Sequence, residues 1–291
     1  MSRAILERTP PPADRRIAYG PDPFQFGDLR LPSGAGPHPL VIVLHGGWWR
    51  SLIGLGYAGH VCAALAEDGI ASWNVEYRRV GAARGGWPMT FADAAAAADF
   101  ASTLAETAPL DLDRVITVGH SAGGHLAMWL AGRHRIPATS PLAGAPRVAL
   151  GGAVSLAGAV DLRLTSEMGL GRSPEGTLAV HKLMGGSPQD VSERYAAGSP
   201  GDLLPLGVRQ VVVTGTLDET VPCDLGRRYV ERARARGDDA SLIEIEGADH
   251  FDPVDPDSAA FERVRSAVRD LTGGRASRRE SKSCSQRTQG V

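Results

Sequence analysis

The sequence predicts an α/β fold, a mostly parallel, doubly wound sheet flanked by helices. Runs typical of strands alternate with runs typical of helices along most of the 291 residues. The run PLVIVL at residues 39–44 is continuously apolar, as expected for a strand that is buried on both faces. Strands that alternate with helices favour right-handed βαβ units, and ligands bind such sheets beyond the carboxyl ends of the strands. Functional residues are therefore expected at those ends.

Each element follows from its local pattern. The runs at residues 16–20 and 24–32 indicate an antiparallel pair that opens the sheet. The helix at residues 57–69 ends at a glycine, a residue typical of helix C-termini. Thr90 and Asp93 resemble a capping box at the start of a long helix, with Asp in place of Glu or Gln. The other strands are expected at residues 39–47, 70–79, 114–121, 151–160, 209–215 and 241–250, and the other helices at residues 90–108, 123–134, 223–237 and 258–271.

The pattern indicates one domain, residues 15–272, which follows a proline-rich lead-in at residues 1–14. The polar tail at residues 273–291 lacks apolar periodicity, and we expect it to be disordered. Within the domain, residues 161–206 separate two strands by more than a helix crossover requires. The loop-like pieces of this segment predict a small lid-like insertion over the functional site, too short for a separate cap domain.

Composition narrows the class of protein. Hydrophobic residues make up 43% of the chain and the formal net charge is −2, so we expect a sizeable core and no surface that binds nucleic acid or a membrane. The three cysteines, Cys62, Cys223 and Cys284, predict neither a disulfide framework nor a metal site. The N-terminus resembles no signal peptide, and no run of about 18 apolar residues predicts a membrane span. We expect a soluble cytoplasmic protein, and the sequence leaves a homodimer open.

The stretch GHSAGGH at residues 119–125 lies between a predicted strand and a predicted helix and fits the pattern G-x-S-x-G. In that context the pattern predicts a nucleophilic Ser121 on a strained turn, where a side chain at Gly119 or Gly123 would collide with the backbone. His125, inside the helix, is interpreted as structural. The alternative for the whole stretch is an ordinary glycine-rich turn.

A serine becomes a nucleophile beside a base that an acid holds in place. His250 follows the last predicted strand, and Asp218 follows the strand before it. Because the loops after these two strands face each other, we interpret His250 as the base and Asp218 as the acid. Asp161, at the end of an earlier strand, is the other candidate acid, which we interpret instead as a turn or helix-cap residue. Asp249 is expected to point elsewhere.

The stretch HGGWWR at residues 45–50 follows another predicted strand. Its glycines let the loop turn backbone N–H groups inward, where they stabilise the negative oxygen of a tetrahedral acyl intermediate. We predict an oxyanion hole formed by the backbone of Ala122 and of Gly47 or Trp48. His45 is interpreted as bracing the loop. The alternative for this stretch is a tight turn after a buried strand.

The motifs HGGWW, GHSAGGHLA, AGAVDL, GTLDETVP and GADHF together resemble the α/β-hydrolase superfamily over nearly the whole chain. The resemblance is to its esterase, acetyl esterase and kynurenine-formamidase-like members. It implies a serine hydrolase without metal or cofactor, in which Ser121, Asp218 and His250 form the catalytic triad. The hormone-sensitive-lipase-like branch usually shows HGGG and GDSAGG, whereas this chain has Trp48 and His120 at the third glycine and the aspartate. HGG followed by an aromatic residue and tryptophan is more similar to kynurenine formamidase, although the pattern also occurs in broad esterases.

The expected reaction is hydrolysis of a small carboxylic ester through an acyl-enzyme, and an N-formyl aryl amide or another amide is the alternative substrate. The same fold also serves acyltransferases and non-catalytic ligand binders. Candidate walls of a partly apolar substrate pocket are Trp48, Trp49, Trp87 and Met168, and such a pocket suits a small acyl ester or aryl amide. Cys223 is interpreted as a buried cysteine at a helix start.

Overall fold

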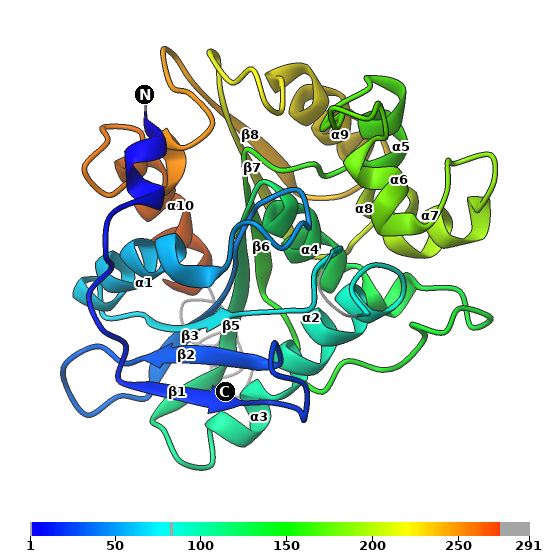
Figure 1. The fold of residues 1–291 in the computed structure, drawn as a ribbon. Coiled ribbons are helices and arrows are strands. Elements are labelled where there is room, and N and C mark those ends of the chain that lie inside the picture. Colours follow the sequence, from blue (N-terminus) through cyan, green and yellow to red (C-terminus); the bar gives the residue numbers. More distant parts are fainter. Residues whose placement is uncertain (1, 82–83, 274–291) are drawn as a thin grey trace, which may run out of the picture.

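The computed structural model describes residues 2–81 and 84–273 of the chain. Within these residues the strands form one eight-stranded sheet through the middle of the molecule (Figure 1). The strands are β1 (Arg15–Ala18), β2 (Phe26–Arg30), β3 (His38–Leu44), β4 (Ala71–Val75), β5 (Leu110–His120), β6 (Gly152–Leu156), β7 (Arg209–Gly215) and β8 (Ala240–Ile245).

The strand order is β1-β2-β4-β3-β5-β6-β7-β8, so β3 and β5 lie at the centre of the sheet. The pairs β1–β2 and β2–β4 are antiparallel, and all the other described pairs are parallel. The predicted mostly parallel sheet and its opening antiparallel pair are therefore confirmed. In a parallel arrangement the carboxyl ends of β3, β5, β6, β7 and β8 share one edge, and the loops that follow them meet there.

The sheet is buried on both faces because its central strands are apolar at successive positions. Along β3, Val41 and Val43 belong to one hydrophobic cluster, whereas Leu40, Ile42 and Leu44 belong to the other. Successive side chains of a strand point to opposite faces, so a strand between two clusters must be apolar throughout.

Helices cover both faces of the sheet (Figure 1). One face packs against α1 (Ala58–Glu67) and α10 (Phe261–Gly273). The other packs against α2 (Met89–Asp99), α4 (Ala122–Ala131) and α9 (Cys223–Ala235). The shorter helices are α3 (Ala101–Leu104), α5 (Leu162–Glu167), α6 (Ala179–Met184), α7 (Ser192–Gly198) and α8 (Pro200–Leu203).

The helix expected at residues 90–108 is shorter than predicted and lacks the predicted capping box. It divides into α2 and α3, and the N-cap of α2 is Pro88. The Thr90 hydroxyl donates to the carbonyl of Arg78 at 2.6 Å. Asp93 accepts hydrogen bonds from the Arg78 guanidinium at 2.6 and 2.8 Å. Tertiary contacts thus engage both side chains that the sequence pattern assigned to the cap.

Residues 161–206, all of which the structure describes, form α5 to α8 beside α4 and α9 (Figure 1).

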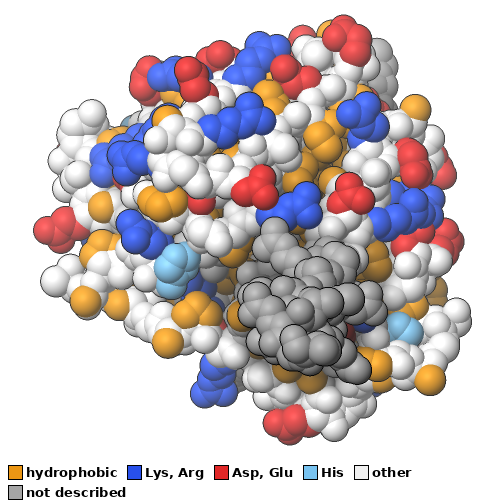
Figure 2. Space-filling model, turned by 180° about the vertical axis from the view of Figure 1, so that it is seen from behind, with side chains coloured by type: hydrophobic (Ala, Val, Ile, Leu, Met, Phe, Trp, Pro, Cys, Tyr) orange, Lys and Arg blue, Asp and Glu red, His pale blue; other side chains and the backbone are white. Residues whose placement is uncertain are grey.

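The lead-in begins with the 3₁₀ helix η1 (Ser2–Leu6), and Ile5 in it is fully buried. The tail was predicted to be disordered from residue 273, but Gly273 is the last residue of α10, and residues 274–291 lie outside the described residues. No helix in the described part of the chain is both long and apolar enough to cross a membrane. On the face shown in Figure 2, acidic and basic side chains are interspersed.

Candidate active site

Ser121 lies on the turn between β5 and α4, at the carboxyl edge of the sheet. Its backbone has φ 54° and ψ −118°, a region that few residues other than glycine adopt, so the turn is strained. A Cβ at Gly119 would lie 2.0 Å from the carbonyl oxygen of Gly123, and a Cβ at Gly123 would lie 2.0 Å from that of Leu44. Both backbone collisions predicted for the glycines are therefore present.

Asp218 and His250 come from the loops after β7 and β8, which are neighbouring strands. His250 Nδ1 donates a hydrogen bond to Asp218 Oδ2 at 2.8 Å. The other carboxylate oxygen accepts hydrogen bonds from the backbone N–H groups of Thr220 and Val221, both at 2.8 Å. Both side chains are buried. The carboxylate is thus held firmly, and His250 turns Nδ1 toward it, which leaves Nε2 as the nitrogen that can accept a proton.

A cavity of about 200 Å³ opens beside Ser121. Ser121 and His250 both line it, so the structure brings these two residues to one site. Among the described residues, the Ser121 hydroxyl makes no hydrogen bond to His250. Such contacts are often long before a substrate binds. None of the described lining residues is acidic, and none is lysine or arginine. The other lining residues are Leu6, Gly47, Trp48, Ile53, Tyr57, His120, Thr220 and Phe251.

The loop after β3 has three consecutive residues with positive φ, namely Gly47 (112°), Trp48 (52°) and Trp49 (56°). A hydrogen bond of 2.9 Å from Arg50 N to Gly47 O closes the turn. Positive φ is costly at tryptophan, and such strain is concentrated at functional sites. The turn places Gly47 and Trp48 in the cavity wall, and Ala122 is the first residue of α4, next to the serine.

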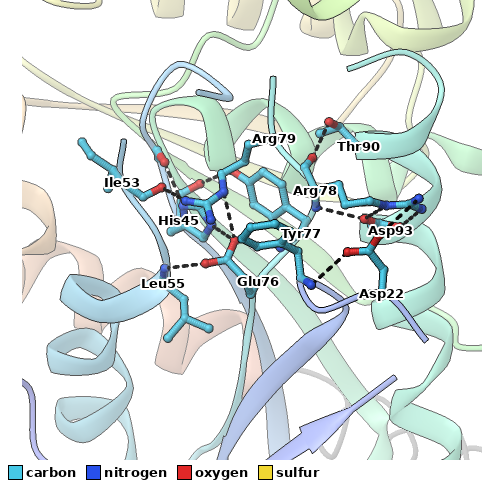
Figure 3. Close-up of polar contacts among 12 residues, drawn as sticks. Asp22, His45, Ile53, Leu55, Glu76, Tyr77, Arg78, Arg79, Thr90 and Asp93 are labelled. Atoms are coloured by element: carbon cyan, nitrogen blue, oxygen red, sulfur yellow. Dashed lines mark hydrogen bonds and ion pairs between the residues drawn. The ribbon is translucent and has the colours of Figure 1, made fainter. Parts of the chain in front are cut away.

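The buried carboxylate of Glu76, just after β4, holds this loop from behind (Figure 3). Glu76 Oε1 lies 2.9 Å from His45 Nε2, and Glu76 Oε2 accepts a hydrogen bond from Leu55 N at 3.2 Å. Arg79 lies 3.3 Å from the same carboxylate and donates to the carbonyl of Ile53. Burial alone would raise the pKa of the Glu76 carboxyl, but the charges of His45 and Arg79 and the hydrogen bonds outweigh burial and lower it. The ionised carboxylate therefore ties the two ends of the loop together.

A second buried chain of hydrogen bonds joins the same loop to the backbone of His250. Gly46 N donates to the Tyr57 hydroxyl at 2.6 Å, and that hydroxyl lies 2.7 Å from His120 Nδ1. His120 Nε2 lies 2.9 Å from the carbonyl oxygen of His250. A carbonyl oxygen only accepts, so Nε2 carries the hydrogen and Nδ1 accepts from Tyr57. Burial, and then the nearby His250, lower the pKa of His120 well below its usual range, which keeps this histidine neutral.

Of the four candidate pocket walls, Trp48 lines the cavity and the other three do not, so the prediction was wrong for them. Trp49 is fully buried and donates from Nε1 to His125 Nδ1 at 3.2 Å. Trp87 lines a different cavity. Met168 ends α5 and packs against the hydrophobic core. The direction of each side chain depends on packing between elements, which nearness in sequence to the motifs does not reveal.

The predicted lid-like segment, residues 161–206, supplies none of the described residues that line the cavity. It contacts the loop after β3 from outside, where Arg50 Nη2 donates to the carbonyl of Gly171 at 2.9 Å. A Cβ at Gly171 would lie 2.9 Å from the ring of Trp48, so the segment packs closely behind that tryptophan. A covering role for this segment stays a prediction.

The interpretation of Asp161 as a helix cap is confirmed. Asp161 is the N-cap of α5, and its Oδ1 accepts a hydrogen bond from Leu164 N at 3.0 Å. Its other carboxylate oxygen pairs with Arg232. Asp249 Oδ1 accepts a hydrogen bond from Phe251 N at 2.9 Å, so this carboxylate engages the backbone of its own turn.

The structural interpretation of two histidines is also confirmed. His45 is fully buried, with Nδ1 2.8 Å from the carbonyl of Gly46, and the Tyr77 hydroxyl donates to the His45 carbonyl at 2.7 Å. His125 Nε2 lies 2.8 Å from the carbonyl oxygen of Gly198. Burial lowers the pKa of His125 to about 4, so this histidine is neutral at physiological pH.

The cysteines lie apart from the cavity lining in the described chain. Cys223 begins α9 as predicted, but it is only partly buried. Burial raises the pKa of the Cys62 thiol to about 11. Cys284 lies outside the described residues. Within the described ranges, no three His, Cys, Asp or Glu side chains are grouped so that they could hold a metal ion.

Sequence reasoning missed several residues that shape the site, among them Leu6, Tyr57, Glu76 and Phe251. Two of them carried a usable signal. Glu76 is a charged residue directly after a strand that is buried throughout, and Phe251 is an apolar neighbour of His250 in a polar loop. Leu6 carried none, because its approach to the cavity depends on how the lead-in crosses the folded domain.

Comparisons with known proteins show the family of the chain. The BD-FAE family model matches residues 28–232, a range that includes Ser121 and Asp218 and ends before His250. Esterase LipC of Mycobacterium tuberculosis (strain ATCC 25618 / H37Rv) is 29% identical over 277 residues, which cover 86% of this chain. The chain spans 65% of the length of LipC.

Solved structures share the fold of the chain. A truncated carbohydrate esterase from gut microbiota has a TM-score of 0.76 at 18% identity, covering 91% of this chain and 100% of that chain. Esterase Est2 of the Planctomycetes species Thermogutta terrifontis has a TM-score of 0.70 at 22% identity, covering 91% of this chain and 95% of that chain. Est2 has also been solved with propionate bound, with butyrate bound and phosphoramylated by tabun.

Proposed function

The chain belongs to the BD-FAE family and has the α/β-hydrolase fold, and from this premise we propose that it is a serine hydrolase of short carboxylic esters. The observation that carries the proposal is the 2.8 Å hydrogen bond between His250 and Asp218 beside the cavity that also holds Ser121. A binding protein on this fold would not require a buried carboxylate that orients a histidine next to a strained serine.

In the proposed reaction, His250 Nε2 takes the proton of the Ser121 hydroxyl while the serine oxygen attacks the ester carbonyl. Asp218 keeps the imidazole oriented and stabilises the imidazolium. The tetrahedral intermediate then expels the alcohol, which takes the proton from His250, and the acyl group stays on Ser121. A water molecule that gives its proton to His250 attacks the acyl-enzyme, and collapse of the second intermediate releases the acid and restores the serine.

The oxyanion of both intermediates is proposed to lie between the backbone N–H of Ala122 and that of Gly47 or Trp48. Two observations support this placement: Gly47 and Trp48 line the cavity together with Ser121, and Ala122 follows Ser121 as the first residue of α4. Each well-placed donor of this kind typically contributes about 10²–10³ in rate. Because the donors belong to the backbone, their position depends on Glu76 and Tyr57 behind the loop.

The size and polarity of the cavity support a small uncharged substrate group. Its volume is about 200 Å³, and an apolar cavity of about 150 Å³ holds a benzene molecule. The described lining contains no acidic residue, lysine or arginine. A charged group of a substrate would therefore find no oppositely charged side chain there. The acyl chains of the propionate and butyrate bound to Est2 are smaller than benzene and would fit within such a volume.

The test is labelling with a fluorophosphonate probe together with hydrolysis of 4-nitrophenyl acetate and butyrate. We expect the wild-type protein to be labelled at Ser121 and to hydrolyse both esters. Ser121→Ala should abolish labelling and lower kcat by at least about 10⁴-fold. The control is Ser102→Ala on α3, where the hydroxyl donates to the Asp99 carbonyl at 2.8 Å. Full labelling of the Ser121→Ala protein would overturn the assignment.

An N-formyl aryl amide is the second candidate substrate, because Trp48 of the HGGWW motif lines the cavity and offers an aromatic contact. The same residues would cleave either bond. We expect a higher kcat/KM for phenyl acetate than for N-formylkynurenine, and the reverse order would make the protein a formamidase. Transfer of most acyl groups to an added alcohol would identify an acyltransferase, and labelling without turnover of any substrate would favour a ligand binder.

A further inference from the structure

We propose that the N-terminal strap, residues 4–8, is a fixed wall of the substrate cavity and that Leu6 determines the largest acyl group that fits. The inference rests on the proposed esterase function and deepens it. The substrate class is esters of short uncharged acyl groups, and the residue proposed to limit the length of the acyl group is Leu6. Leu6 lies outside the family match, because the BD-FAE model begins at residue 28.

The strap reaches the site from the far end of the sequence. Figure 1 shows the N-terminal helix η1 beside the chain that follows β8 and close to α10. Leu6 lines the same cavity as Ser121. The opposite end of the chain contributes His250 and Phe251 to that lining. The cavity therefore closes only when the N-terminal segment packs against the loop that carries the proposed base.

Apolar burial holds the strap in place. Ile5 is fully buried in the hydrophobic cluster that contains residues of α1 and α10. Leu6 is partly buried and packs against the same cluster. Full burial of an apolar side chain as large as that of isoleucine is strongly favourable. The strap is therefore expected to stay in place when the size of Leu6 changes.

Polar contacts hold the end of the strap to the loop after β8. The Arg8 guanidinium pairs with the carboxylates of Asp255 and Asp257, a few residues after His250. On the other side, His60 Nε2 of α1 lies 3.3 Å from the Arg8 carbonyl. The Arg8 side chain is 34% exposed, so solvent weakens its ion pairs. These ion pairs, called the latch below, therefore contribute less to holding the strap than the burial of Ile5 does.

Leu6 is suited to set substrate size because it lies apart from the reacting groups. Its segment supplies neither the proposed triad nor the proposed oxyanion donors, so its side chain can change without moving them. Leu6 shares the cavity with Trp48 of the loop after β3, and we take this wall as the acyl side. A smaller side chain at this position enlarges the cavity and a larger one reduces it.

The test compares kcat/KM for 4-nitrophenyl acetate, butyrate, hexanoate and octanoate in Leu6→Ala, Leu6→Phe and wild-type protein. Each further buried methylene contributes about fourfold. We expect Leu6→Ala to raise the hexanoate-to-acetate ratio by about tenfold or more, and Leu6→Phe to lower the butyrate-to-acetate ratio. The control is Leu52→Ala, because Leu52 is 87% exposed and lies outside the described lining. Equal ratios in Leu6→Ala and wild type, or an equal shift in Leu52→Ala, would overturn the proposal.

Two further arms separate the parts of the inference. In a series of acetates with ethyl, butyl and hexyl alcohols, Leu6→Ala should leave the ratios unchanged, and a shift confined to this series overturns the acyl assignment. Arg8→Gln should shift the acyl ratios in the same direction as Leu6→Ala by a few-fold, whereas Arg16→Gln, which breaks the exposed pair with Asp28, should not. An Arg8→Gln profile equal to that of wild type overturns the latch.

Failure of this inference differs from failure of the proposed function. Wild-type protein that hydrolyses no ester and takes no fluorophosphonate at Ser121 contradicts the esterase itself. Wild-type protein that is labelled and active, with an acyl profile insensitive to Leu6, contradicts only the role of the strap.

Discussion

The backbone of Ser121 is the most constrained feature of the site at the scale of single residues. Its φ is 54°, and the turn between β5 and α4 is so tight that the backbone leaves no room for a side chain at Gly119 or Gly123. The strain aims the hydroxyl into the cavity without relying on a flexible loop. Substitution of either glycine should therefore impair folding rather than only activity.

The choice of acid is a prediction at the same scale. Asp218→Asn removes the charge that orients His250, and kcat should fall by about 10³- to 10⁴-fold with little change in KM. Asp161→Asn weakens the cap of α5 and the pair with Arg232, so it should lower the free energy of unfolding by about 1–3 kcal/mol. Steady-state kinetics and urea unfolding of both variants check this. If Asp161→Asn reduces kcat as much as Asp218→Asn does, the acid is wrongly assigned.

The loops after β3, β7 and β8 form the site at the scale of elements. They meet because the parallel strands end at one edge of the sheet. The buried chain through Tyr57 and His120 connects the loop after β3 to the backbone of His250. The proposed oxyanion donors and the proposed base are thereby held in one arrangement.

Loss of the Tyr57 hydroxyl should therefore affect the reaction more than the binding of substrate. Tyr57→Phe leaves the Gly46 N–H without its partner and frees His120, so we expect kcat to fall by about 10- to 100-fold while KM stays within about threefold. The matched control is Tyr229→Phe on α9, where the buried hydroxyl donates to Gln210 Oε1 at 2.7 Å. Both variants should lose about 1–2 kcal/mol in the free energy of unfolding, but only Tyr57→Phe should slow turnover.

Stability measurements and steady-state kinetics on the two variants separate a positioning role from a merely structural one. Equal reductions of kcat in Tyr57→Phe and Tyr229→Phe would contradict the assignment of Tyr57 to the site.

The same scale shows where local patterns mislead. Thr90 and Asp93 have the spacing of a helix cap, yet Asp93 pairs with Arg78 across the gap between two elements. A buried arginine–carboxylate pair with two hydrogen bonds outweighs a cap bond that is exposed to solvent. The strands and most helices were predicted in the right order because hydrophobic periodicity reports burial directly. Several strands are shorter than predicted, such as β4 at residues 71–75 rather than 70–79 and β6 at residues 152–156 rather than 151–160.

Buried histidines couple the stability of the whole molecule to pH. Burial lowers the pKa of His125 to about 4 and that of His120 well below its usual range, whereas a histidine in the unfolded chain titrates near 6.5. Between those values the unfolded chain binds more protons than the folded protein. The stabilisation is therefore fully present above about pH 6.5 and is lost as the pH falls toward 4.

The expected slope is about 1.4 kcal/mol in the free energy of unfolding per pH unit for each of these histidines. His125→Gln should lower the free energy of unfolding at pH 8, because the buried hydrogen bonds of His125 are lost. Between pH 6.5 and 4.5 it should also reduce the slope of that free energy by about 1.4 kcal/mol per pH unit, which corresponds to one proton. The control is His134→Gln, because His134 is exposed. Urea unfolding across this pH range is the measurement. An unchanged slope in His125→Gln would show that protonation of this histidine does not destabilise the fold.

The sequence by itself determined the alternating architecture, the serine elbow, and the positions of Asp218 and His250 at strand ends. These follow from apolar periodicity and from glycines that a tight turn requires, and both are local properties of the chain. Only the tertiary structure decided which side chains enclose the cavity. Trp49, Trp87 and Met168 lie outside its described lining, whereas Leu6, Tyr57 and Phe251 line it. The lining depends on how segments distant in sequence pack together, and no local pattern encodes that packing.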